Sequence, residues 1–293
     1  MDTHVITFQD DYLNIFTRSY LWQTKHYNVF FDGGLASGAA GKLPYLRDGR
    51  KSVLLLTHGH WDHIGCDSVT KEHGGLVLVG KGDERHITDY DWLWQGLFAQ
   101  FAGDFALPTA RHTVFWSEVG RPVKPDGYLE DGQVLTFDDT SFRVIAIPGH
   151  SMGSVCLMEE RSGVLFCGDG IIGDGFFSGC PQITDLDAYL TSMEKLRAIS
   201  PSQVITAHTP VVDGREWQAL LTRSIDCAKR MLDHVERYAV ESDVLTVSGA
   251  AQAVASGEGK GVGGGTCTTA VAALMRMKDE RAQQALKGYL LRV

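Results

Sequence analysis

Closely spaced cysteines are missing from this sequence. Its six cysteines are scattered along the 293 residues without a C-x-x-C pair, at Cys66, Cys156, Cys167, Cys180, Cys227 and Cys267. A small disulfide-stabilised fold or a cysteine-based zinc site would need such pairs. We therefore expect reduced, buried thiols that act as small apolar residues, in a cytoplasmic protein.

Long apolar runs and an excess of positive charge are missing as well. No uninterrupted apolar stretch is long enough for a transmembrane helix, and the N-terminal "MDTHVITFQDD" has acids where a signal peptide has basic residues. The formal net charge is −9, whereas a nucleic-acid surface needs a basic face. These absences predict a protein that binds a small molecule and neither a membrane nor a nucleic acid. A homodimer stays an open alternative.

The hydrophobic pattern divides the chain into two parts. Strand-like and helix-like segments alternate up to about residue 210, including a helix expected over 185–199 with Thr184 as its N-cap. Helical patterns dominate after that, beginning with the long amphipathic stretch "REWQALLTRSIDCAKRMLDHVERYAV". The pattern predicts an α/β domain over residues 1–212 and a helical region over residues 213–293.

The stretch "LLLTHGHWDHIGC", residues 54–66, concentrates the metal-capable side chains. It holds three of the 11 histidines and an aspartate within six positions, directly after a run of leucines. His58 and His60 point the same way if they extend the strand, because side chains alternate along a strand. Asp62 and His63 then fall at the turn that follows. Four possible ligands therefore surround the C-terminal end of one buried strand.

Three later strand-like segments also end in a possible ligand. "FRVIAIPGH" ends at His150, "GVLFCGD" at Asp169 and "PSQVITAH" at His208. Strand ends of this kind converge on one edge of a layered sheet, and the total of five histidines and two aspartates suffices for two metal ions with a shared carboxylate. The sequence thus predicts a site for two divalent ions. The nitrogen and oxygen donors favour zinc and also accept iron or manganese.

These segments resemble motifs of the metallo-β-lactamase superfamily, in its glyoxalase II-like branch. The resemblance covers about residues 5–212 and is carried by "FFDGG", "THGHWDH", "PGHSMGS", "FCGDG" and "TAHTP". It implies an α/β fold of the αββα sandwich type, with the metal site at one edge and the helical region as a C-terminal extension.

The resemblance also implies a role for each candidate residue. The first ion would be held by His58, His60 and His150. The second would be held by Asp62, His63 and His208. Asp169 would bridge the two ions, and Asp32, in "FFDGG", would organise the site without binding metal.

An aromatic-rich helical insert is expected at about residues 83–118. Its segment "DYDWLWQGLFAQFAGDF" predicts either a lid that presents aromatic rings to the substrate or a helix that only packs on the sandwich. His86 is expected at the surface, with a polar substrate contact as the alternative. Four side chains are candidate walls of a substrate pocket: Trp94, Phe98, Ile171 and Phe176.

The function that these features favour is hydrolysis of an ester, thioester or lactone with an apolar acyl part. A metal-bridging hydroxide would attack the carbonyl, while Asp62 fixes the second ion and accepts a proton from the attacking water. His60 stands where flavodiiron reductases of the superfamily have Glu, which favours hydrolysis over oxygen reduction. Residues 213–293 contain no convincing counterpart of the Arg/Lys set with which glyoxalase II binds glutathione, which argues against a glutathione thioester.

Two other hypotheses stay open. One is a mononuclear iron dioxygenase that acts on persulfides. The other is a ligand-binding or signalling protein that contains the metal site but acts through partners. The number and identity of bound metal ions, and turnover on a panel of esters, would distinguish the three.

Overall fold

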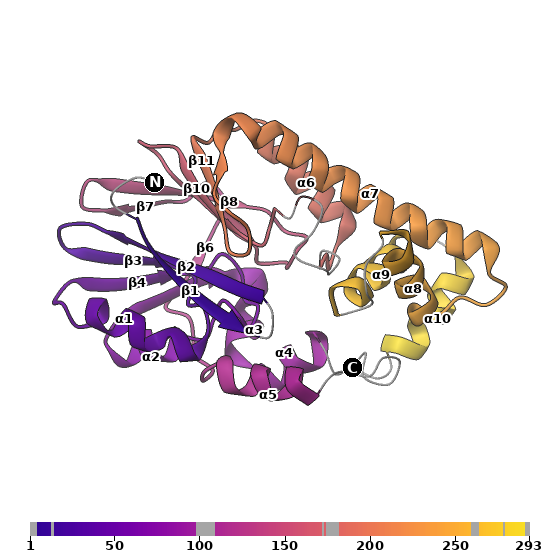
Figure 1. Ribbon diagram of the computed structural model, residues 1–293, viewed down its shortest axis with the longest axis horizontal. Coiled ribbons are helices and arrows are strands. Elements are labelled where there is room, and N and C mark those ends of the chain that lie inside the picture. Colours follow the sequence, from indigo (N-terminus) through magenta and orange to yellow (C-terminus); the bar gives the residue numbers. More distant parts are fainter. Residues whose placement is uncertain are drawn as a thin grey trace.

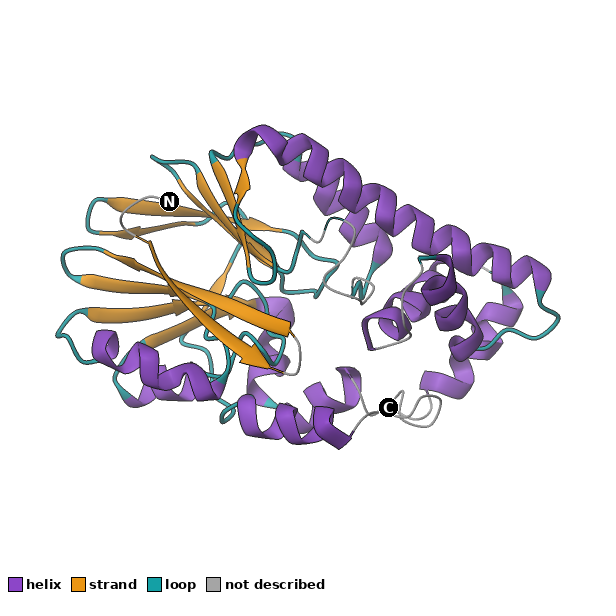
Figure 2. Cartoon of the chain, in the orientation of Figure 1, coloured by secondary structure: helices purple, strands orange, loops and turns teal. Residues whose placement is uncertain are grey.

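Two six-stranded β-sheets form the centre of the molecule, between layers of helices (Figures 1 and 2). The computed structural model describes residues 5–12, 15–97, 109–171, 173, 182–258, 264–277 and 279–290. The prediction of an αββα sandwich with a helical C-terminal extension is confirmed. Among the described residues, every helix is too short or too polar to span a lipid bilayer.

Each sheet mixes parallel and antiparallel neighbours. The first sheet contains, in spatial order, β1 (Val5–Tyr12), β2 (Ile15–Gln23), β3 (Tyr27–Phe31), β4 (Lys51–Leu55), β5 (Leu76–Gly80) and β6 (Gly127–Leu129). Its strands run parallel from β3 to β6 and antiparallel before that. The second sheet contains β12 (Val212–Asp213), β11 (Gln203–Thr206), β10 (Val164–Gly168), β9 (Val155–Glu159), β8 (Thr140–Ala146) and β7 (Val134–Phe137). Only β10 and β11 are parallel there.

Aromatic side chains fill the space between the two sheets. Phe31 on β3 stacks on Phe166 on β10 with ring centroids 3.8 Å apart, and Phe142 on β8 meets Phe31 edge-on at 5.1 Å. In β4, Leu55 faces this inner core while Leu54 packs against the helices outside. Alternate residues of β4 are therefore buried on opposite faces, as expected for a strand that is apolar throughout.

Helices cover the outer face of each sheet. Five cover the first sheet: α1 (Ala39–Leu46), α2 (Asp67–Glu72), α3 (Glu84–Thr88), α4 (Tyr90–Leu97) and α5 (Thr109–Glu118). The second sheet is covered by α6 (Leu186–Leu196) and α7 (Trp217–Glu241), and the chain continues through α8 (Val247–Gly257), α9 (Gly264–Arg276) and α10 (Glu280–Leu290). The short 3₁₀ helices include η1 (Ala36–Gly38), η2 (Lys81–Asp83) and η4 (Gly214–Glu216).

One apolar cluster joins the second sheet to the C-terminal helices. It includes Leu165 on β10, Tyr189 on α6, Met231 on α7 and Ala273 on α9, all fully buried. One end of the long helix α7 therefore packs on the sandwich, and helices α8–α10 lie near its other end (Figure 1). The buried cysteines of the described part include Cys66, Cys156, Cys167 and Cys227.

The N-cap prediction for α6 was wrong by one residue. The side chain of Asp185 caps the helix by accepting a hydrogen bond from the Ala188 amide at 2.9 Å. Thr184 instead donates its hydroxyl to the Gly149 carbonyl at 3.0 Å. The helix ends at Leu196, so residues 197–199 of the predicted range lie beyond it.

Candidate metal centre

The seven candidate ligands lie where four strands end at one edge of the sandwich. His58, His60, Asp62 and His63 follow β4, His150 follows β8, Asp169 follows β10 and His208 follows β11. All seven side chains are buried, and the most exposed of them, His208, is only 7% exposed. The ligands come from both sheets, so the site spans the two halves of the sandwich.

Two groups of three side chains could each hold one metal ion. The first ligand group consists of His58, His60 and His150. The second ligand group consists of Asp62, His63 and His208. Within each group, one ligand atom from each residue lies within 4.8 Å of the others, so a small inward shift of the side chains would bring all three to about 2 Å from one ion.

Asp169 lies between the two groups. Its Oδ2 is 3.1 Å from His208 Nε2 and 3.6 Å from His63 Nε2 in the second group, and 4.0 Å from His150 Nε2 in the first. It also forms a third possible ligand set with His58 and His63. A carboxylate in this place can contact an ion in either group.

Several polar atoms that point into this edge have no hydrogen bond. They are Nε2 of His58, His60, His63 and His150 and Oδ1 of Asp169, all fully buried. A buried polar atom without a partner costs about 1–3 kcal/mol. Five such atoms on the candidate ligands fit a site that holds metal ions.

The other ring nitrogen of two histidines is fixed by the backbone. His150 Nδ1 donates to the Gln182 carbonyl at 2.7 Å, and His208 Nδ1 donates to the Phe16 carbonyl at 2.5 Å. A carbonyl oxygen can only accept, so the proton of each neutral ring is on Nδ1. Nε2 then keeps its lone pair for a metal ion.

Asp32 supports the second ligand group from behind. It is 3% exposed, and its Oδ2 accepts a hydrogen bond from His63 Nδ1 at 3.0 Å. The Thr57 amide and hydroxyl donate to the same carboxylate at 2.7 and 2.8 Å. Asp32 thus fixes the orientation of His63 without pointing at the metal position, as a site-organising carboxylate would.

Burial and charge act differently on the two groups. Burial lowers the pKa of all three histidines of the first ligand group, which keeps them as the neutral imidazoles that bind metal. Burial acts the same way on His208, but Asp169 and Asp62 reverse the effect and raise its pKa to about 10. An ion that binds to the second ligand group therefore displaces a proton.

A model of the metallo-beta-lactamase superfamily matches residues 15–208, a range that contains Asp32 and all seven candidate ligands. The chain belongs to the metallo-β-lactamase superfamily. The chain resembles several curated members. Hydroxyacylglutathione hydrolase GloC of Haemophilus influenzae is 29% identical over 159 residues, which cover 54% of this chain and 67% of GloC. The human acyl-coenzyme A thioesterase MBLAC2 is 28% identical over 151 residues, half of each chain.

Similarity of fold extends further along the chain. The crystal structure of the metallo-beta-lactamase family protein TTHA1429 from Thermus thermophilus covers 94% of this chain and 94% of its own, with a TM-score of 0.75 and 17% identity. At this identity the match concerns the fold alone. By sequence, the chain spans about half the length of most of the curated relatives that it matches.

The pocket candidates of this superfamily member lie in different surroundings. Trp94 is partly buried in the outer apolar cluster, with its ring 5.0 Å from that of Phe115. Ile171 is 1% exposed and belongs to the apolar cluster that joins the second sheet to the helices. Phe98 and Phe176 lie outside the described residues. The roles of these four residues in a substrate pocket, and of the insert as a lid, stay predictions.

Three further side chains at this edge were not predicted as part of the metal site. The Tyr12 hydroxyl, at the end of β1, donates to Asp62 Oδ2 at 2.7 Å. Asp83 accepts hydrogen bonds from the loops that carry His58, His60 and His150, and His86 lies beside it with its ring centroid 5.9 Å from that of His60. Asp83 follows the strand-like "LVLVG", so the strand-end rule that found the ligands could have found it too.

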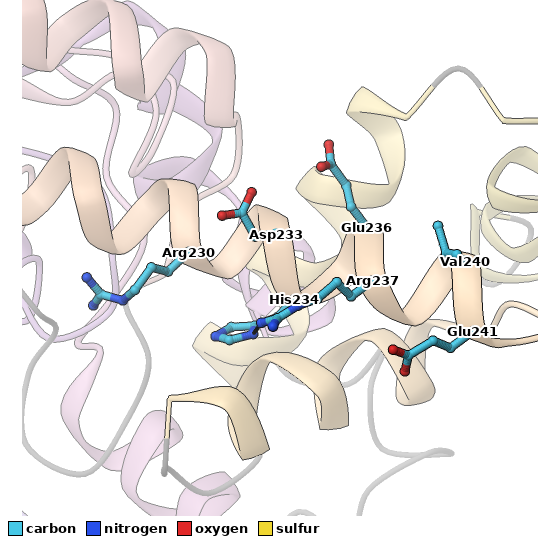
Figure 3. Close-up of a pocket in the computed structure, with 7 residues that line it drawn as sticks. All are labelled: Arg230, Asp233, His234, Glu236, Arg237, Val240 and Glu241. Atoms are coloured by element: carbon cyan, nitrogen blue, oxygen red, sulfur yellow. Dashed lines mark hydrogen bonds between the residues drawn. The ribbon is translucent and has the colours of Figure 1, made fainter.

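A pocket of about 520 Å³ lies elsewhere, along α7 (Figure 3). Its lining includes Arg230, His234 and Arg237 but none of the candidate ligands. Arg230 and His234 both form ion pairs with Glu258, which follows α8, at 3.1 Å. These two side chains therefore fasten the end of α8 to α7.

Proposed function

We propose that the protein is a metal-dependent hydrolase of an ester, thioester or lactone with an apolar acyl part. The observation that carries the proposal is the set of buried, unpaired ligand atoms at the strand ends of a metallo-β-lactamase superfamily member. Thioesters among these substrates are supported by the names of two relatives, a hydroxyacylglutathione hydrolase and an acyl-coenzyme A thioesterase. The alignment with GloC covers 54% of this chain.

The side chains fit two divalent ions, with zinc favoured by the donor set. When bound, such ions acidify water and polarise a carbonyl group. His58, His60 and His150 would hold the first ion and contribute no charge. Asp62, His63 and His208 would hold the second, with Asp169 in contact with both. The presence of a complete second ligand group favours this hypothesis over a mononuclear iron dioxygenase.

Asp62 is the residue placed to accept a proton during hydrolysis. Burial alone would raise the pKa of this carboxyl, but the positive charges of His63 and His208 hold it well below its usual range. Without metal, Asp62 is therefore a carboxylate at neutral pH. The Tyr12 hydroxyl donates to its Oδ2 and fixes its orientation towards the ligand edge.

The remaining parts of the proposal concern the whole chain. We place the hydrolase domain at residues 1–212, including the helical insert at about 83–118, and the helical region at 213–293. A small-molecule substrate and a cytoplasmic location belong to the same proposal.

The experiment is to measure metal content by elemental analysis and turnover on a panel of acetyl and longer-chain esters and thioesters. We expect close to two ions per chain, and hydrolysis that is lost on chelation and restored by Zn²⁺. Asp169→Ala should lose at least one ion and most of the activity. The control is Asp139→Ala, which removes an exposed aspartate from the turn between β7 and β8. It should keep both ions and the activity. A metal-replete protein that turns over none of these substrates would contradict the hydrolase proposal.

A further inference from the structure

Asp83, at the end of η2, makes hydrogen bonds to two separate loops of the metal edge. Its side chain is completely buried. Oδ2 accepts a hydrogen bond from the Gly59 amide at 2.8 Å, and Gly59 stands between His58 and His60. Oδ1 accepts a hydrogen bond from the Gly153 amide at 2.7 Å, in the loop that follows His150. One carboxylate thus contacts both loops that supply the first ligand group.

A third contact strengthens the connection to the His150 loop. Ser151, the residue after His150, donates its hydroxyl to Asp83 Oδ2 at 2.6 Å. The same hydroxyl lies 2.7 Å from the Ser154 hydroxyl, and the Ser151 amide donates to Ser154 Oγ at 3.1 Å. The loop from Ser151 to Ser154 therefore closes around the Asp83 carboxylate.

The two loops are shaped to approach Asp83 closely. A Cβ atom on Gly153 would lie 2.5 Å from the Asp83 amide nitrogen and 2.6 Å from its Cγ. A Cβ atom on Gly59 would lie 2.5 Å from His86 Cβ and 3.1 Å from Asp83 Cβ. Glycine at these two positions is what allows the loop backbones to reach the carboxylate.

The Asp83 carboxylate has hydrogen-bond partners without a metal ion. His86 Nδ1 lies 3.2 Å from Oδ1, and hydrogen bonds from two amides and one hydroxyl surround the carboxylate. A buried carboxylate with such partners is a rigid anchor, since any displacement would leave a charge without hydrogen bonds. The second ligand group is held by other groups: Asp32 behind His63, the Phe16 carbonyl behind His208 and the Tyr12 hydroxyl beside Asp62.

We infer that Asp83 is the positioning residue of the first ligand group, and that it holds the His58–His60 loop and the His150 loop at the separation that one ion needs. The inference rests on the proposed metal-dependent function. Loss of Asp83 then weakens binding of the first ion and leaves binding of the second nearly unchanged. Loss of Asp32 instead weakens binding of the second ion through His63, and it also reaches His58 through the Thr57 hydroxyl.

The test is a calorimetric titration of Zn²⁺ into metal-free protein, which reports the affinity of two binding steps independently of activity. Asp83→Asn keeps the size of the side chain but replaces one acceptor oxygen by an amide group that cannot accept from an N–H. We expect the Kd of one step to rise about 10- to 100-fold, the usual effect of losing a residue that supports metal ligands. The Kd of the other step should stay within about twofold of the wild-type value. Asp32→Asn should weaken that other step.

Asp126→Asn is the matched control, because Asp126 accepts a hydrogen bond from the Val77 amide at 2.8 Å near the opposite end of β5, away from the ligands. It should lower thermal stability and leave both Kd values unchanged. If Asp83→Asn does not fold, Ser151→Ala, which removes a single donor, should weaken the same step by a smaller factor. Equal weakening of both steps, or wild-type affinity in both variants, would overturn the inference. A wild-type protein that binds no Zn²⁺ would instead overturn the proposed function.

Discussion

Four of the five histidines at the metal edge have a hydrogen-bond partner at Nδ1. His150 and His208 donate to backbone carbonyls, whereas His63 meets the Asp32 carboxylate and His58 meets the Thr57 hydroxyl at 3.2 Å. A ring fixed at one nitrogen keeps the other aimed in one direction, so binding an ion requires little rearrangement. The residues behind the ligands therefore decide affinity as much as the ligands do.

Tyr12→Phe tests whether a residue behind the ligands affects metal binding and activity at the second ligand group. The change removes the 2.7 Å hydrogen bond to Asp62 but keeps the ring, which packs edge-on against Trp61 at 5.0 Å. We expect the fold to be retained and kcat/KM to fall about tenfold, equivalent to ~1.4 kcal/mol of transition-state stabilisation. Affinity for the second ion should fall as well. Steady-state kinetics and a Zn²⁺ titration measure the two effects.

Tyr90→Phe is the control for this substitution, because it removes a buried tyrosine hydroxyl that donates to the Arg121 carbonyl at 3.1 Å, away from the ligands. It should leave kcat/KM and Zn²⁺ affinity unchanged. If Tyr12→Phe behaves like this control, the contact with Asp62 has no functional role.

That the seven candidate ligands come together was predictable from the sequence, because each follows the C-terminal end of a buried strand. Asp83 follows the same rule and was overlooked because no histidine stands next to it. The contact between Tyr12 and Asp62 joins residues 50 positions apart and is set by how the β1–β2 hairpin packs. No local pattern in the sequence could therefore predict this contact.

At the scale of whole elements, helix α9 contacts the loop whose backbone holds the candidate ligand His150 in place. Thr269 on α9 accepts a hydrogen bond from the Ile183 amide at 3.1 Å through its hydroxyl. The preceding residue, Gln182, accepts the hydrogen bond from His150 Nδ1. Arg276 on α9 also pairs with Asp187 on α6 at 3.1 Å. The C-terminal helices thus support the loop behind the first ligand group.

Thr269→Val removes the acceptor for the Ile183 amide and keeps the side-chain shape. Because that amide is buried, we expect a loss of about 1–3 kcal/mol in the free energy of unfolding. Affinity for the first ion should fall, since the Gln182 carbonyl loses its support. Chemical denaturation and a Zn²⁺ titration measure these changes.

The control is Thr222→Val, which makes the same change on the exposed side of α7, where the hydroxyl donates to the Gln218 carbonyl of its own helix and accepts two long hydrogen bonds of 3.4 Å from the exposed Arg197. We expect the free energy of unfolding of the control to stay within about 0.5 kcal/mol of the wild-type value. A Thr269→Val protein with unchanged stability and affinity would show that α9 only packs beside the loop.

Hydrophobic periodicity located α7 almost to the residue, since the stretch from residue 215 to 240 forms a helix over Trp217–Glu241. It also indicated further helices in the tail. It could not indicate that α9 returns to the loop before α6, because that contact joins residues 86 positions apart. The pattern along one helix defines its apolar face but not which segment covers that face.

For the whole molecule, the candidate metal centre connects the two sheets. His58, His60, Asp62 and His63 come from the first sheet, whereas His150, Asp169 and His208 come from the second. Each ligand group contains residues from both. Bound ions would therefore cross-link the two halves of the sandwich at one edge, while the stacked rings of Phe31 and Phe166 join them in the centre.

Removal of metal should consequently destabilise the protein unevenly. A ligand present at 100 times its Kd stabilises the folded state by about 2.7 kcal/mol, so chelation should lower Tm by several degrees, and added Zn²⁺ should restore it. Hydrogen exchange should quicken in the loops that follow β4, β8, β10 and β11, because their histidines and aspartates lose the ions that join the sheets. The amides of β3 and β10 around Phe31 and Phe166 should keep their protection, since the aromatic core does not depend on the ions. Exchange that quickens equally at both places, or a Tm that does not respond to chelation of protein shown to contain metal, would contradict the view that the ions cross-link the sheets.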